Sequence, residues 1–175
     1  MRAIDAMSDE KSATASVRRE LSNGPMDGRP PFTVFLSGVM QGSHADNSLH
    51  AQDYRRRLRD IITAEHPEAE VVCPAELNPD SVAYDTEAAR RAFMGELDLA
   101  AETDVLVAYA PVATMGTAVE MYRAHAAGRL VFTVSPMATN WAVRFLSNRV
   151  FGDLAEFEAF VRDGDLGRTV AAHAS

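Results

Sequence analysis

Residues 104–120 decide the fold: they read Asp104-Val-Leu-Val-Ala-Tyr-Ala-Pro-Val-Ala-Thr-Met-Gly-Thr-Ala-Val-Glu120. The stretch begins as a short apolar run, which is typical of a buried strand, and continues through a glycine turn into a helix. In open α/β sheets, ligands bind where the carboxyl end of a strand meets the next helix. The stretch therefore predicts a parallel sheet with a site around Thr114, Gly116, Thr117 and Glu120.

The same turn also fits a helix cap without any function. Thr117 and Glu120 stand three residues apart, as in a capping box, where the threonine caps the helix and the glutamate caps the threonine amide. The position after a strand favours a ligand site, because the free amides of a helix N-terminus attract anions. Both interpretations of Glu120 stay open from spacing alone.

Composition limits the class of protein. The chain has 175 residues, 47% of them hydrophobic, which suits one domain with a substantial core. Its formal net charge of -8 argues against a nucleic-acid polymer or an anionic membrane as partner, since both bind basic surfaces. Cys73 is the single cysteine, so no intrachain disulfide forms and a cytoplasmic location is expected.

Neither a membrane span nor a metal site is predicted. No apolar stretch approaches the roughly 20 residues that a membrane helix needs. The five histidines lack paired ligand spacing with Cys, Asp or Glu. We therefore expect no metal and no cofactor.

Apolar runs and helically spaced apolar residues alternate along the chain. We expect strands at 32–37, 71–73, 105–109, 130–134 and 149–151, and helices at 49–65, 85–101, 117–127, 140–146 and 154–161. This order predicts a single-domain, doubly wound α/β fold, flavodoxin-like or Rossmann-like, with a parallel sheet of about five strands and helices on both faces.

The chain divides into three expected segments. Residues 1–31 are polar and rich in turn residues, which predicts a flexible N-terminal tail. Residues 32–163 form the expected catalytic domain, and residues 164–175 an expected C-terminal tail. Within the domain, 74–84 is interpreted as a polar loop, and Asp104 as a structural residue at the start of a strand.

The helix expected at 49–65 carries several arginines among its apolar positions. We interpret them as a solvated face, because charged residues usually line the outer side of an amphipathic helix. They are Arg55, Arg56, Arg57 and Arg59.

Four parts of the chain carry a family pattern. They are the loop Phe35-Leu-Ser-Gly-Val-Met-Gln-Gly-Ser43, the carboxylates of Glu96-Leu-Asp98, the turn Thr114-Met-Gly-Thr-Ala-Val-Glu120, and the helix and strand from Met121 to Val134. In this order they resemble the nucleoside 2-deoxyribosyltransferase-like superfamily, and within it the nucleoside 5′-monophosphate N-glycosidases. The resemblance spans about residues 32–161.

The resemblance implies that Glu120 is the nucleophile at the anomeric carbon of a nucleoside. It also implies a second carboxylate, for which both Asp98 and Glu96 stay open, with Asp98 slightly favoured as the family's residue type. This chemistry suits the reaction, because cleaving an N-glycosidic bond develops positive charge on the sugar and negative charge on the base.

The resemblance further implies a set of substrate-binding residues. Family sites are usually completed by a neighbouring subunit, so a homodimer with a shared active site is expected. Relatives that cleave nucleotides often have arginine where this chain has Gln41, which leaves recognition of the 5′-phosphate open. The implied residues are Ser37, Gly38, Gln41, Gly42, Ser43, Thr114, Gly116, Thr117, Asn140 and Ser147.

The expected function is hydrolysis of a nucleoside or nucleoside 5′-monophosphate to free base and sugar or sugar phosphate. One alternative is a nucleoside 2-deoxyribosyltransferase, which moves the sugar to another base; another is a non-catalytic nucleotide-binding module. The phosphoribohydrolases of the lysine-decarboxylase-like family fit less well, because their turn begins Pro-Gly-Gly. The base, the sugar and the need for a phosphate stay open.

Overall fold

The structure of the protein is a computed structural model that describes residues 31–42, 44–46 and 48–174. The chain divides into two units, 1–31 and 32–175. The expected tail at 1–31 therefore lies outside the described residues, apart from Pro31.

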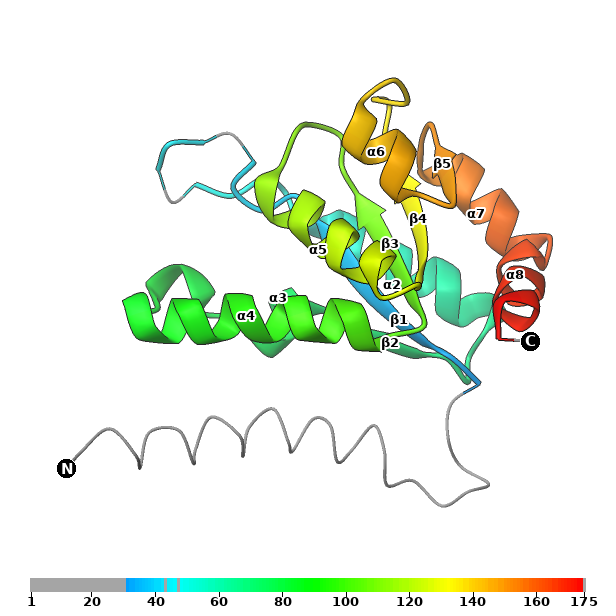
Figure 1. Ribbon diagram of the computed structural model, residues 1–175, viewed down its shortest axis with the longest axis horizontal. Coiled ribbons are helices and arrows are strands. Elements are labelled where there is room, and N and C mark those ends of the chain that lie inside the picture. The colour runs from blue at the N-terminus through cyan, green and yellow to red at the C-terminus, as the bar shows by residue number, and fades with distance from the viewer. Residues whose placement is uncertain (1–30, 43, 47, 175) are drawn as a thin grey trace, which may run out of the picture. The chain divides into compact units, whose positions relative to one another are not determined.

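The second unit alternates strands and helices, as the sequence predicts (Figure 1). The elements are β1 (Thr33–Gly38), α2 (Asp53–Glu65), β2 (Glu70–Val72), α3 (Pro74–Leu77), the 3₁₀ turn η1 (Ser81–Ala83), α4 (Thr86–Glu102), β3 (Val105–Tyr109), α5 (Met115–Ala126), β4 (Leu130–Val134), α6 (Trp141–Leu146), β5 (Arg149–Phe151), α7 (Leu154–Arg162) and α8 (Asp165–His173).

The strands form one five-stranded sheet in the order β2-β1-β3-β4-β5, and all pairs are parallel. After β1 the chain builds β2 on one side, and then crosses back to build β3 on the other. This reversal is the topological switch point, where open α/β sheets bind their ligands at the carboxyl ends of the strands. The predicted α/β fold is confirmed, and its strand order is flavodoxin-like.

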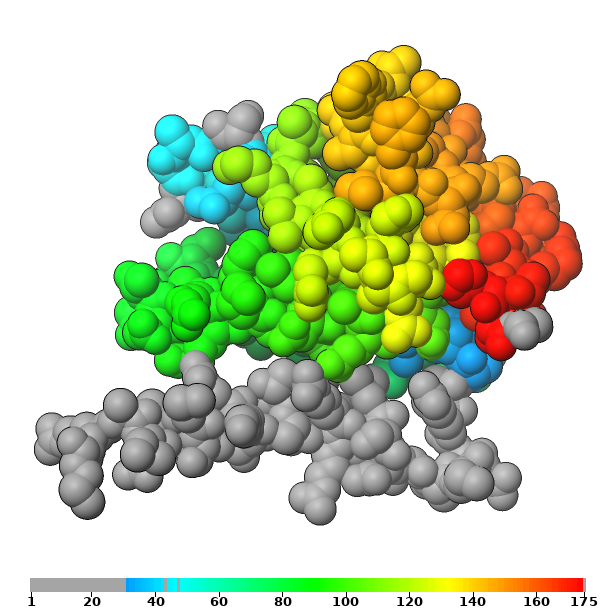
Figure 2. Space-filling view, viewed as in Figure 1, coloured from blue at the N-terminus to red at the C-terminus, as the bar shows by residue number. Residues whose placement is uncertain are grey.

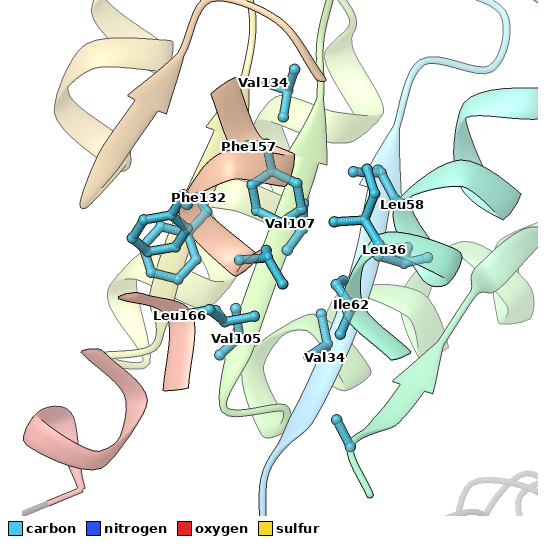
Figure 3. Packing of buried hydrophobic residues seen from close by; sticks show 14 of the residues in the cluster. Val34, Leu36, Leu58, Ile62, Val105, Val107, Phe132, Val134, Phe157 and Leu166 are labelled. Carbon is cyan, nitrogen blue, oxygen red and sulfur yellow. The ribbon is translucent and has the colours of Figure 1, made fainter. Parts of the chain in front are cut away.

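The main apolar core lies between the sheet and helices α2, α7 and α8 (Figure 3). Alternate residues of β1, β3 and β4 point to this side, because successive strand residues face opposite ways. The residues labelled in the figure are Val34, Leu36, Leu58, Ile62, Val105, Val107, Phe132, Val134, Phe157 and Leu166.

Helices α4 and α5 pack against each other and cover the opposite face (Figure 1). The strand residues that alternate with the main core point this way, and Phe35, Leu106 and Val131 are fully buried. Ser37 shares this alternation, so its side chain lies on the same face as α5. The fold thereby directs one polar residue of β1 toward the helix that carries Glu120.

Asp104 joins the starts of the two central strands. Its Oδ2 accepts hydrogen bonds from the Thr33 amide at 2.8 Å and the Thr33 hydroxyl at 2.9 Å, and the Asp104 amide donates to Thr33 Oγ1 at 3.0 Å. The structural role predicted for Asp104 is confirmed.

Two segments are more regular than the sequence analysis predicts. The stretch expected as a loop at 74–84 contains α3 and η1. The stretch expected as a tail at 164–175 contains α8, because Leu166 and Val170 lie one helical turn apart and bury against the main core. Within the described ranges, no helix is long and apolar enough to cross a membrane.

We expect Gly38→Ala to destabilise the fold. A Cβ at this position would lie 2.5 Å from the Tyr54 hydroxyl oxygen, so Tyr54 would lose its hydrogen bond to Val39 and its stacking on Tyr109. Urea denaturation should show a free energy of unfolding lower by about 1–3 kcal/mol. The control is Gly95→Ala within α4, where a Cβ meets nothing within 4 Å and a gain of up to about 1 kcal/mol is expected. Wild-type stability of Gly38→Ala would contradict the close contact.

Candidate active site

Glu120 lies on α5 and is buried, with 7% of its surface exposed. The hydroxyl of Ser37, at the carboxyl end of β1, donates a hydrogen bond to Oε2 of Glu120. The carboxylate is therefore held at the carboxyl ends of the neighbouring strands β1 and β3, which is the switch point.

The capping-box interpretation of Glu120 is wrong. Helix α5 begins at Met115 with Thr114 as its N-cap residue, two positions earlier than the sequence analysis predicts. Thr117 is thus inside the helix, and Glu120 lies beyond the first turn with its carboxylate on Ser37.

Burial raises the pKa of Glu120 from 4.5 to about 7. The hydrogen bond from Ser37 and the positive charge of Arg55 act in the opposite direction, and the negative charge of Glu96 adds to the rise. Near neutral pH, protonated and ionised Glu120 are therefore both populated.

Glu96, on α4, is a second carboxylate, and its negative charge acts on Glu120. The Asn78 side-chain amide donates to Oε1 of Glu96 at 3.0 Å, and the Tyr84 hydroxyl donates to Asn78 Oδ1 at 3.4 Å. Burial raises the pKa of Glu96, whereas Asn78 and Arg55 oppose the rise. The negative charge of Glu96 in turn favours the protonated form of Glu120.

Asp98 faces elsewhere. Its Oδ1 accepts a hydrogen bond from Nη2 of Arg123 at 3.2 Å, and 44% of its side chain is exposed. Positions two apart on a helix point about 200° apart, so α4 directs only one of Glu96 and Asp98 toward Glu120. The geometry brings Glu96 to Glu120, although the sequence analysis slightly favours Asp98.

Arg55, on α2, is a site component that the sequence analysis misses. The prediction of a solvated face holds for Arg56 and Arg57, which are exposed, but is wrong for Arg55, which is buried. Arg55 stands three residues before Leu58, on the apolar stripe of α2. This spacing indicates a buried position, but the sequence analysis assigns Arg55 to the solvated face because the residue is charged.

The first loop has both described and masked members. The Gln41 side chain is exposed and donates to the Asp46 carbonyl at 3.1 Å. Gly42 has a φ of 59°, a region that favours glycine, and a Cβ there would lie 2.7 Å from Nε2 of His50. Ser43 lies outside the described residues.

The start of α5 is open. The Thr114 side chain makes no hydrogen bond to the helix amides among the described residues. Its hydroxyl lies 3.4 Å from the hydroxyl of Thr117. A Cβ on Gly116 would meet no described atom within 4 Å. Room for a ligand therefore exists beside the first turn of the helix that carries Glu120.

Asn140 and Ser147 hydrogen-bond to residues of α6 and β4. Asn140 caps α6 by accepting from the amides of Ala142 and Val143. The Ser147 hydroxyl lies 2.7 Å from that of Thr133. Among the described contacts, neither residue joins Glu120.

A cavity of about 370 Å³ opens at the same edge of the sheet, but on the α2 and α7 side. Its lining includes Arg57, Tyr109, Ser135 and Leu154, and none of Ser37, Glu96 and Glu120. We place the candidate site at the carboxylates, because the cavity lining has no comparable cluster of buried ionisable groups.

Comparison with known proteins supports the fold. No protein-family model matches the chain, and no curated protein matches it in sequence. Among solved structures, it is similar to a 2-deoxyribosyltransferase from the psychrotolerant bacterium Bacillus psychrosaccharolyticus, with a TM-score of 0.55 and 16% identity over 72% of this chain and 90% of that chain.

Two further structures are similar. A conserved protein from Enterococcus faecalis V583 has a TM-score of 0.53 and 18% identity, over 75% of this chain and 98% of that chain. A CMP N-glycosidase from Clostridium botulinum has a TM-score of 0.46 and 17% identity, over 74% of this chain and 98% of that chain. The chain therefore has the fold of a 2-deoxyribosyltransferase, as the resemblance in its motifs predicts.

We expect Glu120→Gln to stabilise the fold at high pH. Glutamine keeps an acceptor for Ser37 but cannot ionise. Because folding raises the pKa of Glu120, its contribution to stability is fully present below the unfolded pKa of 4.5 and is lost as pH rises through about 7. Urea denaturation should show the variant more stable by an amount on the order of 3 kcal/mol at about pH 8, and by little at about pH 4.5. A difference independent of pH would contradict the burial of an ionisable Glu120.

Proposed function

We propose that the protein cleaves the N-glycosidic bond of a nucleoside or nucleoside 5′-monophosphate, with Glu120 as nucleophile. The observation that supports this most is the arrangement of Glu120 and Glu96 at the switch point: Glu120 is buried, Glu96 is half-buried, the negative charge of Glu96 acts on Glu120, and each carboxyl group is oriented by a side-chain hydrogen bond. A nucleophilic carboxylate and an acid with a raised pKa are the two groups that glycoside cleavage requires.

In the first step, ionised Glu120 attacks C1′ of the sugar. A bond forms between its carboxylate oxygen and C1′, and the bond from C1′ to the base nitrogen breaks. The base leaves with that electron pair and takes a proton from Glu96. The products of this step are a free base and a sugar ester of Glu120.

In the second step, the ester is resolved. Glu96, now ionised, removes a proton from water as the water oxygen attacks C1′, and the ester bond to Glu120 breaks. Glu96 is protonated again and Glu120 is again ionised. If another base attacks C1′ instead of water, the same site acts as a 2-deoxyribosyltransferase.

Residues around the carboxylates provide the binding groups. Ser37, Gly38, Gln41, Gly42 and Ser43 contact the sugar or its 5′ end. The open start of α5, with Thr114, Gly116 and Thr117, gives amides and hydroxyls for an anionic or polar group of the substrate.

A second copy of the chain completes the site. Helices α5 and α6 lie side by side on the face seen in Figure 2, and they carry exposed apolar side chains, such as Met115 at 82% and Trp141 at 78% exposure. Such surfaces commonly become buried in homodimers. Asn140 and Ser147 at the ends of α6 are the residues that the partner copy contributes.

Base release tests the proposal directly. Wild-type protein is incubated with ribonucleosides, deoxyribonucleosides and their 5′-monophosphates, with and without an acceptor base, and the products are separated by chromatography. We expect release of a base, reduced at least about a thousandfold by Glu120→Gln. A new nucleoside in the presence of the acceptor identifies a transferase. If the wild type releases no base from any member, a nucleotide-binding module is favoured instead.

A second pair of variants tests the role of Glu96. Glu96→Gln removes the proton donor and is expected to lower kcat at least about a hundredfold, with the largest loss for substrates whose base leaves poorly. Asp98→Asn is the matched control on the same helix and should retain near wild-type kcat, because Asp98 pairs with Arg123 at the surface. A large loss in Asp98→Asn with none in Glu96→Gln would reverse the assignment.

A further inference from the structure

Arg55 is a buried cation that pairs with no carboxylate of its own among the described residues. It is 6% exposed, and its guanidinium contacts backbone carbonyls, the Gln52 side chain at 2.8 Å and the Cys73 sulfur at 4.0 Å. A buried charge is unfavourable unless hydrogen bonds and nearby opposite charge compensate it. The position of Arg55 therefore needs an explanation.

The two carbonyls that Arg55 holds lie on either side of Ser37. Nη1 donates to the carbonyl of Leu36 at 2.9 Å, and Nη2 donates to the carbonyl of Gly38 at 3.2 Å. The planar guanidinium fork fixes two acceptors at once. Ser37, between them, donates its hydroxyl to Glu120.

Strand β1 needs a donor at this point because its neighbour has ended. The Glu70 amide donates to the Phe32 carbonyl, and a parallel ladder advances two residues at a time. By this register the Leu36 carbonyl would meet residue 74, but Pro74 has no N–H and begins α3. Arg55 supplies the donor that the sheet lacks.

Resting on the proposed function of Glu120, we infer that Arg55 is a positioning residue for the nucleophile. It fixes the β1 backbone on both sides of Ser37, so that the Ser37 hydroxyl holds the Glu120 carboxylate in one orientation for attack on C1′. Its charge, from α2, also favours the ionised nucleophile.

The groups that face Glu120 from neighbouring elements are Glu96 on α4, Arg55 and Tyr54 on α2, and Ser37 on β1. Burial raises the pKa of Tyr54 above its ordinary value, so Tyr54 stays neutral. Arg55 is therefore the only cation in this group, and it lowers the pKa of both Glu120 and Glu96.

The first test needs no substrate, so it stands apart from any failure of the proposed function. The side-chain carboxyl carbon of Glu120 is titrated by ¹³C NMR in the wild type, Arg55→Gln and Arg55→Lys. We expect the midpoint to rise in Arg55→Gln and to rise by less in Arg55→Lys, which keeps the charge. Arg56 is an exposed neighbour on the same helix. In Arg56→Gln the Glu120 carboxyl carbon should therefore titrate with the wild-type midpoint. An unchanged midpoint in Arg55→Gln overturns the inference.

The second test uses base release. Lysine cannot hold two carbonyls with one planar fork, so kcat should fall at least about tenfold in Arg55→Lys as well as in Arg55→Gln, with KM changed less than about threefold. In Arg55→Gln the rising limb of the pH profile should also move to higher pH. A loss confined to KM overturns the positioning role.

If both Arg55 variants fail to fold, a pH titration of the wild-type protein still tests the inference. The guanidinium ¹⁵N signals of Arg55 should shift with pH at the same midpoint as the Glu120 carboxyl carbon. Arginine signals that stay constant through that transition overturn the inference.

Discussion

The hydrogen bond from Ser37 to Glu120 joins the carboxyl end of β1 to α5, two elements that are far apart in the chain. It holds a buried carboxylate between a sheet and a helix. A buried carboxylate is unfavourable when ionised unless donors and positive charge surround it. The residues around the switch point meet this requirement in part, because Ser37 and Arg55 lower the pKa of Glu120 while burial and Glu96 raise it. The pKa of Glu120, about 7, is the net result of these opposing effects.

The two faces of the sheet contribute to this contact in different ways. On the α2 side, Leu36 belongs to the main core, which keeps β1 rigid. On the α5 side, its neighbour Ser37 points to the carboxylate. Gly38 then allows Tyr54 to approach the backbone closely, so the end of β1 is packed on one side and polar on the other. Alternation along a single strand is enough to couple a rigid core to a polar site.

The sequence predicts the fold well because its apolar runs and helical spacings are local. It also predicts Glu120 as a site residue, since a strand, a turn and a helix follow one another within one stretch. It does not predict which of Glu96 and Asp98 faces Glu120, because that depends on the rotation of α4 about its own axis. Arg55 is missed because charge normally indicates a solvated face, whereas here the missing N–H of Pro74 leaves a carbonyl for it. Asn78 lies in a segment without periodicity, so its contact with Glu96 arises only from tertiary structure.

The two carboxylates share one hydrogen-bonding arrangement, and it suits both of the roles proposed for them. Glu120 is anchored through Oε2 by a hydroxyl, and Glu96 through Oε1 by an amide. Among the residues that the structure describes, the other oxygen of each carboxylate makes no hydrogen bond, so it is free to react. The free oxygen of Glu120 can form a bond to carbon while its partner oxygen stays on Ser37. The free oxygen of Glu96 can carry a proton, because burial raises the pKa of this carboxyl group. One anchored and one free oxygen on each group is the arrangement that a nucleophile and a proton donor both need, since orientation and reactivity are then supplied by different atoms.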